Sequence, residues 1–166
     1  MILDPSIGFT ALYVALIYGI YYSFFECFPI VYVDGYGFSL GSQALVYLSI
    51  SVGIIMAVAM YFVWIRITWE PAVRTWNIGP PERRLIPALF ASFLLPIGLF
   101  LFAWTATPDI NWVVPTIGIA ILSGGIFLIM QSIFLYLPLS YPKYVASVFA
   151  GNSVARSVLA AAIVHA

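Results

Sequence analysis

Apolar residues fill five long stretches of the chain, and short polar segments separate them. The stretches cover residues 7–31, 42–65, 85–106, 112–137 and 145–166. A helix of about 20 apolar residues crosses the ~30 Å hydrocarbon core of a bilayer, whereas a barrel strand needs only about 10 residues. The pattern therefore predicts an all-α, polytopic helical membrane protein, in which residues 1–166 form a single transmembrane domain with about five transmembrane helices.

The composition agrees with this pattern and excludes several classes of protein. Hydrophobic residues make up 64% of the 166 residues and charged residues 7%, and the mean hydropathy is +1.09. A soluble domain carries about 25% charged residues, so we expect the lipid bilayer to be the main partner. The formal net charge is zero, which gives no electrostatic reason to expect a nucleic acid as partner.

Residues that perform catalysis or bind metals do not gather in the sequence. Cys27 is the single cysteine, so neither an internal disulfide nor a thiolate metal cluster is expected. The sequence contains no cluster of metal-ligand residues, no nucleophile with a base at a useful spacing, and no phosphate-binding glycine loop. We therefore expect no enzyme activity, no cofactor and no metal.

The basic residues predict how the chain lies in the membrane. Five of the six Lys and Arg residues lie in the segment 66–84 or at position 143. Two apolar stretches separate these positions, so they lie on one side of the bilayer, which the positive-inside rule identifies as cytoplasmic. Residues 66–84, which include three prolines, are expected to form an irregular cytoplasmic loop. The loops at Asp34 and Asp109 then face outward.

Small residues and prolines predict where helices approach closely or bend. Small residues allow close approach of two helices in a membrane, and they recur here at Ala11, Ala15 and Gly19, at Gly53 and Ala57, and at Gly124 and Gly125. Proline removes a backbone donor and clashes with the preceding turn. We expect Pro29 to kink or end the first helix, and Pro96 to kink the third.

Glu26 is the strongest functional candidate, because it lies within the first apolar stretch. An ionised group at membrane depth is costly unless it faces protein or water. A carboxylate in a partly dry site can take up and release a proton near neutral pH, as a proton-coupled transporter requires. The structural alternative is a solvated, hydrogen-bonded Glu26 near the outer end of its helix.

Other polar and aromatic residues in the apolar stretches are further candidates. Asn152 and Arg156 are four residues apart and share one helix face, and Glu26 is one potential partner for Arg156. A backbone carbonyl is the alternative partner. Tyr22 and its aromatic neighbours suit a pocket for flat or cationic hydrophobic compounds, although such residues also pack or face lipid. Gln131 offers hydrogen bonds to a substrate or to another helix.

Several short motifs, in order along nearly the whole chain, resemble the fungal drug:proton antiporters of the major facilitator superfamily. They are Tyr18-Gly-Ile-Tyr-Tyr-Ser-Phe-Phe-Glu-Cys-Phe-Pro-Ile-Val31, Gly37-Phe-Ser-Leu-Gly41, Pro81-Glu-Arg-Arg-Leu85, Leu94-Leu-Pro-Ile-Gly-Leu-Phe100, Trp112-Val-Val-Pro115 and Ala150-Gly-Asn152. They resemble spans seven to eleven of that family. Many relatives carry an Asn-Tyr-x-x-Asp pattern where this chain has Leu135-Tyr136 and Leu139. The segment Pro138-Leu-Ser-Tyr-Pro142 resembles instead the sub-branch of multidrug and mycotoxin exporters.

The resemblance implies a fold and a function. The family has twelve spans in two six-span halves with the substrate cavity between them, so this chain resembles a partial C-terminal half. The implied function is proton-coupled export of small hydrophobic or cationic substrates at the plasma membrane. This chain would act together with the missing N-terminal half or another membrane subunit, with Glu26 handling a proton or a cationic substrate. The alternative is a truncated, non-transporting membrane protein or a helper subunit.

Overall fold

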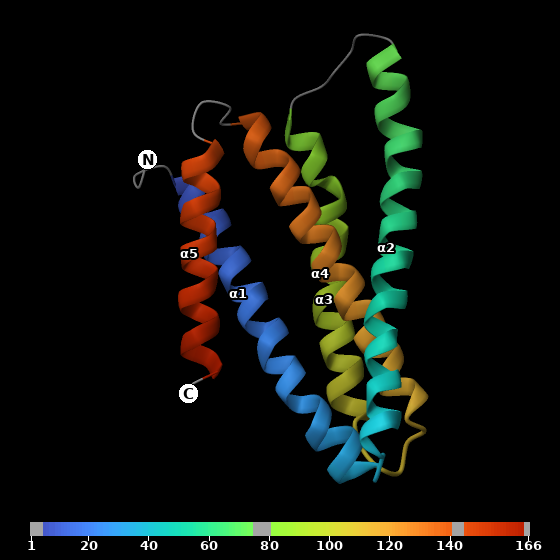
Figure 1. Ribbon diagram of the computed structural model, residues 1–166. Coiled ribbons are helices and arrows are strands. Elements are labelled where there is room, and N and C mark those ends of the chain that lie inside the picture. Colours follow the sequence, from blue (N-terminus) through green and yellow to red (C-terminus); the bar gives the residue numbers. More distant parts are fainter. Residues whose placement is uncertain (1–4, 75–80, 141–144, 165–166) are drawn as a thin grey trace.

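The computed structural model describes residues 5–74, 81–140 and 145–164 (Figure 1). These residues form helices and connecting turns without any strand, so the predicted all-α class is confirmed. The elements are α1 (Pro5–Phe28), η1 (Pro29–Gly35), α2 (Leu40–Arg74), η2 (Pro81–Leu85), α3 (Ile86–Thr105), α4 (Val113–Ser140) and α5 (Val145–Val164).

Four of the described helical segments are long and apolar enough to cross a membrane. They are Ile7–Gly35, Leu40–Thr68, Arg83–Thr105 and Val113–Ser140. The fifth helix, α5, is 20 residues long and is not among these four segments. Its crossing of the membrane therefore stays a prediction.

The helices alternate in direction, and they form two groups. Figure 1 shows α1, α3 and α5 beginning, and α2 and α4 ending, at the same end of the molecule. We call this the basic end, because Arg83 and Arg84 lie there at the start of the third span. This alternation agrees with the order of spans expected from the sequence, whereas the side that faces the cytoplasm stays a prediction and Lys143 lies outside the described residues. Helix α4 packs mainly on α2 and α3, whereas α1 packs mainly on α5.

Glycines bring α4 into backbone contact with both of its neighbours. A Cβ atom at Gly53 of α2 would collide with the backbone of Ala120, and one at Gly98 of α3 would lie 2.8 Å from the backbone nitrogen of Leu122. The adjacent Gly124 and Gly125 face different helices, α2 and α3 respectively. The expectation that small residues in the second and fourth stretches serve close helix packing is therefore confirmed.

Pro29 changes the helix type, as the sequence suggested. The α-helical turn ends at Phe28, and the wider π-helix η1 runs from Pro29 to Gly35. Proline has no amide hydrogen to continue the α-helical pattern, and the wider turn accommodates it. Pro96 lies within α3, which continues as one helix from Ile86 to Thr105.

The loop expected over residues 66–84 begins later than the sequence suggested. Helix α2 continues to Arg74, and η2 begins at Pro81, while residues 75–80 lie outside the described part. Residues 54–70 contain neither glycine nor proline, so no helix breaker lies where the chain becomes polar at Arg66, and α2 continues through Pro71 to Arg74. The polar composition was a poor guide to where the helix ends.

Aromatic side chains join α1 to the other helices at the end opposite the basic end, which we call the aromatic end. The Phe28 ring lies 5.1 Å from the Tyr47 ring and 6.2 Å from the Phe102 ring. The Tyr36 hydroxyl lies within hydrogen-bonding distance of three backbone carbonyl oxygens between α3 and α4: Thr105 at 3.3 Å, Thr107 at 2.7 Å and Ile110 at 2.9 Å. This end of the molecule is thereby closed, and α1 diverges from α3 and α4 toward the basic end (Figure 1).

Candidate functional site

Glu26 is an exposed carboxylate inside an apolar span. It lies in the segment Ile7–Gly35, which is long enough to cross a membrane, and its side chain is exposed. Glu26 lies nine residues before the end of this segment at Gly35. An exposed carboxylate at that depth needs water or another protein surface beside it, because lipid does not solvate it.

Two tyrosines precede Glu26 at four-residue intervals on the same helix. Tyr18, Tyr22 and Glu26 therefore lie along one side of α1. The rings of Tyr18 and Tyr22 are 5.4 Å apart, and Tyr22 is 41% exposed. We call these three residues, together with Arg156 of α5, the polar row. The row combines an exposed acid, two aromatic rings and a cation within the membrane-spanning part of the molecule.

Arg156 completes the row by packing on the aromatic face of Tyr18. Its guanidinium carbon lies 4.7 Å from the centre of the Tyr18 ring, and the side chain is half-buried. A cation over an aromatic face is attracted by the ring quadrupole, by about 0.5–2 kcal/mol depending on how far the pair is desolvated. The contact fixes α5 against α1 at this level.

Asn152 lies one turn before Arg156 and is almost completely buried. Its side chain is 3% exposed, and neither its amide nitrogen nor its carbonyl oxygen has a hydrogen-bond partner among the described residues. Buried polar atoms nearly always have a partner, and leaving one unpaired costs about 1–3 kcal/mol. The two polar residues of α5 are therefore close in space, as their spacing suggested, but Asn152 is incompletely satisfied.

The structure does not bring every sequence-based candidate together. Arg156 contacts Tyr18, which is eight residues and roughly 12 Å along α1 from Glu26, so the suggested pairing of Arg156 with Glu26 is not observed between these two described residues. Gln131 is half-buried on α4, which packs mainly on α2 and α3 and only slightly on α1. Spacing along one helix could not reveal which turn of α1 lies opposite α5.

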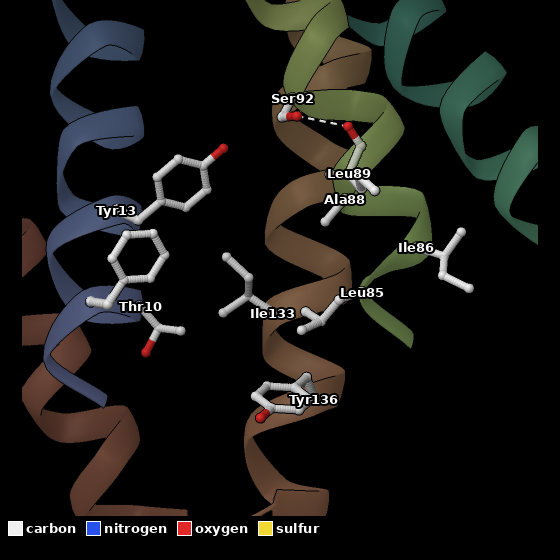
Figure 2. A pocket seen from close by; sticks show the side chains of 10 residues that line it. Thr10, Tyr13, Leu85, Ile86, Ala88, Leu89, Ser92, Ile133 and Tyr136 are labelled. Atoms are coloured by element: carbon white, nitrogen blue, oxygen red, sulfur yellow. Dashed lines mark hydrogen bonds between the residues drawn. The ribbon is translucent and has the colours of Figure 1, made fainter. Parts of the chain in front are cut away.

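A cavity of about 800 Å³ opens where α1 diverges from α3 and α4 near the basic end (Figure 2). Figure 2 shows Tyr13 of α1 on one side and Ile133 and Tyr136 of α4 on the other, with Leu85 of η2 and Ala88 of α3 beside them. Its walls are mostly apolar, and its volume falls within the range typical of sites for small molecules, about 300–1,000 Å³. Sequence reasoning missed this cavity, because it results from the divergence of helices and not from any motif.

The part of the chain that the structure describes offers no place for a metal ion. No three His, Cys, Asp or Glu side chains lie together within those residues. The polar row instead combines one acid and one cation, well separated, with aromatic rings between them. Such an arrangement is suited to binding and proton exchange.

Comparison with known proteins identifies relatives over nearly the whole chain. The chain is 43% identical over 162 residues to the MFS-type transporter pyvG of Aspergillus violaceofuscus, covering 98% of this chain and 30% of that protein. It is 40% identical over 161 residues to the cycloheximide resistance protein of Candida maltosa, with coverages of 96% and 29%. It is 43% identical over 164 residues to the multidrug transporter FLR1 of Candida glabrata, with coverages of 98% and 28%.

The assignment of the chain to a family rests on these sequence matches alone. No family model matches the chain, and no solved structure matches it either. The chain spans about three tenths of the length of the relatives it matches. Its apolar helices and the identity of its relatives make it an integral membrane protein. Over 98% of its length, the chain is related to part of the fungal MFS-type and multidrug transporters, as the resemblance of its motifs suggested.

Proposed function

We propose that this chain forms part of a proton-coupled exporter of small hydrophobic compounds in the plasma membrane. The observation that carries the proposal is Glu26, an exposed carboxylate inside an apolar span at the end of the polar row. An ionisable residue at this depth marks a pathway for protons, ions or substrate in membrane proteins. Transport, and not catalysis, is the activity that such an arrangement serves.

The polar row also supports a proposal for which side of α1 faces the transport pathway. An exposed acid beside an exposed tyrosine is unfavourable against hydrocarbon and favourable against a water-filled cavity. In a transporter made of two halves, the surface between the halves holds such a cavity. We therefore place Tyr22 and Glu26 on the surface that faces the second half of the transporter, which this chain needs as a partner.

The chemistry of the row favours hydrophobic aromatic substrates. Tyr18 and Tyr22 present adjacent rings, which bind flat apolar compounds by stacking and by burial of apolar area. Two relatives are named for multidrug transport and for cycloheximide resistance, which supports this substrate class. In each transport cycle, Glu26 would alternate between a protonated state and an ionised state as substrate and proton exchange places.

The test is to replace the carboxylate with its neutral isostere. Glu26→Gln, expressed from the protein's own complete gene in yeast that lacks its native efflux pumps, should lose efflux of a fluorescent hydrophobic dye at least tenfold. Its abundance in the plasma membrane should be unchanged. Asp109→Asn is the matched control, because Asp109 is an exposed acid in the loop between α3 and α4, and it should retain efflux. If Glu26→Gln still exports the dye and this export still depends on the proton gradient, the proposal is wrong.

A further inference from the structure

The contact between α1 and α5 leaves strong hydrogen-bonding groups without partners. Arg156 lies over the Tyr18 ring, and its planar guanidinium has five N–H donors, so donors remain for an acceptor beside the ring. One turn away, both amide atoms of the buried Asn152 have no partner among the described residues. The Arg156 guanidinium and the Asn152 amide nitrogen, on one face of α5, are therefore left to donate hydrogen bonds to an acceptor from outside the described chain.

The charge at this place suits an acceptor that carries one negative charge. Residues 5–35 contain no Lys or Arg, and Arg156 is the single basic residue in residues 145–164. One half-buried cation balances one negative charge, whereas a phosphate with two charges would retain an uncompensated charge beside the apolar helices. The planar fork of an arginine matches the two oxygens of a carboxylate. The neighbouring tyrosine rings provide an apolar aromatic surface beside that carboxylate.

We propose that Arg156 and Asn152, with the Tyr18 and Tyr22 rings beside them, bind the carboxylate of an aromatic organic acid. The guanidinium and the Asn152 amide nitrogen donate to the carboxylate oxygens, and the aromatic body of the acid lies along the tyrosines toward Glu26. This inference rests on the proposed function, because it names a substrate class for the same pathway. The inference goes beyond the proposed function because it assigns recognition of an acid to Arg156, whereas Glu26 carries the proton.

The separation of the two charged groups makes this division of roles feasible. Tyr18 and Glu26 are eight residues apart on α1, roughly 12 Å along the helix axis. A carboxylate bound at Arg156 therefore does not lie directly against the Glu26 carboxylate, and the two negative charges do not exclude each other. If the carboxylate of the acid binds Arg156, its aromatic group extends along the two tyrosine rings toward Glu26.

A binding experiment with a matched pair of probes tests this proposal. The protein in lipid nanodiscs is titrated with 2-naphthoate and with 2-naphthamide, which have the same aromatic body but differ in charge, and empty nanodiscs correct for partition into lipid. The naphthoate should bind at least tenfold more tightly than the naphthamide. Equal binding of the two probes to the unmodified protein would overturn the proposal without any variant.

Variants then locate the preference. Arg156→Gln and Asn152→Asp should each reduce the preference for naphthoate at least tenfold, and Arg156→Lys should retain part of it, because the charge remains but the planar fork does not. Arg66→Gln, which removes a cation elsewhere in the chain, should leave it unchanged. Circular dichroism checks whether Arg156→Gln folds. If it does not fold, Arg156→Lys is used in its place. A preference that Arg156→Lys and Asn152→Asp both leave intact overturns the assignment.

The same assay separates this inference from the proposed function. Glu26→Gln should keep the preference for naphthoate, because Glu26 lies away from the carboxylate, even though it should lose proton-coupled efflux. A protein that binds naphthoate selectively but does not export would contradict the proposed function alone. A protein that exports hydrophobic dyes but does not distinguish naphthoate from naphthamide would contradict the carboxylate site alone.

Discussion

Two groups of helices in this molecule pack by different means. In the first group, α2, α3 and α4 meet through glycines, so that backbones touch and Gly53 and Gly98 have no room for a side chain. In the second group, the contact of α1 with α5 includes Arg156 over the Tyr18 ring, and the buried Asn152 of α5 has no hydrogen-bond partner among the described residues. Burial singles out α4 and does not separate the two groups, because half of the residues in the most apolar part of α4 are buried, against 33% in α1, 28% in α3 and 17% in α2.

This difference indicates which part of the chain provides stability and which part provides chemistry. Close backbone packing favours one fixed arrangement, since interiors that are packed at high density deform little. The pair α1 and α5 is destabilised by Arg156, Glu26 and the unpaired Asn152, because charged and unpaired polar groups are costly in an apolar environment. The proposed transport pathway belongs to the second group, and the first group supports it.

The largest effect is expected where the two groups join. Phe28 is 1% exposed and contacts rings of α2 and α3 through Tyr47 and Phe102. Removing a buried phenylalanine side chain costs about 3–5 kcal/mol in soluble proteins, so Phe28→Ala should lower the free energy of unfolding in detergent micelles by a value of that order. Phe100→Ala, at a position that is 67% exposed on α3, is the control. A similar loss in both variants would mean that Phe28 does not join the two groups.

The next effect distinguishes the glycine contacts from ordinary helix positions. Gly53→Ala or Gly98→Ala places a methyl group against the α4 backbone, and overpacking of this kind costs about 1–3 kcal/mol. Gly151→Ala on α5 adds the same methyl group where nothing lies within 4 Å, so it should leave stability unchanged or slightly raised. Chemical denaturation in micelles measures all three variants. Equal stabilities would contradict close packing in the first group.

The sequence predicted these two groups unequally. The apolar stretches and the small residues Gly53, Gly124 and Gly125 indicated the helices and their close contacts, because the length of a span and the size of a side chain are local properties. The end of α2 was missed, since helical hydrogen bonds continue after the composition becomes polar. A motif search could not reveal the cavity in Figure 2, because the angle between α1 and α3 produces it.

The candidate site was predicted as a set of residues but not as a geometry. Glu26, Asn152 and Arg156 were recognised because polar groups are rare in an apolar stretch. The contact of Arg156 with Tyr18 was not recognised, since the depth of α5 relative to α1 follows from tertiary packing. The sequence did contain one indication of the polar row, since the four-residue spacing of Tyr18, Tyr22 and Glu26 places all three on one side of α1.

A smaller effect is expected at the aromatic end, where one hydroxyl contacts three carbonyl oxygens. Tyr36→Phe removes this donor and should cost about 0.5–1.5 kcal/mol of stability, the usual net value of one hydrogen bond. Burial raises the pKa of the Tyr36 phenol above its ordinary value. The folded state therefore binds this proton more tightly than the unfolded state, and the contribution is present at neutral pH and lost as the pH rises past about 10.

Two controls sharpen that measurement. Tyr13→Phe, in the wall of the cavity, removes a hydroxyl near the basic end and should have little effect on stability. The difference in stability between the unmodified protein and Tyr36→Phe should also disappear in strongly alkaline buffer. A difference that stays constant across that range would show that the Tyr36 hydroxyl does not act as the donor.

The smallest effect concerns the contact that defines the second group. Tyr18→Leu keeps an apolar side chain but removes the ring beneath Arg156, and should weaken the α1–α5 contact by about 0.5–1 kcal/mol. Tyr18→Phe keeps the ring and should change little. Hydrogen exchange of the α5 amides in micelles measures this, because local opening of α5 exposes them to exchange. We expect about two- to fivefold faster exchange in Tyr18→Leu than in Tyr18→Phe, by the same free-energy difference. Equal exchange in the two variants would mean that α5 is held by apolar packing alone, and the distinction between the two helix groups would then rest on the glycine contacts.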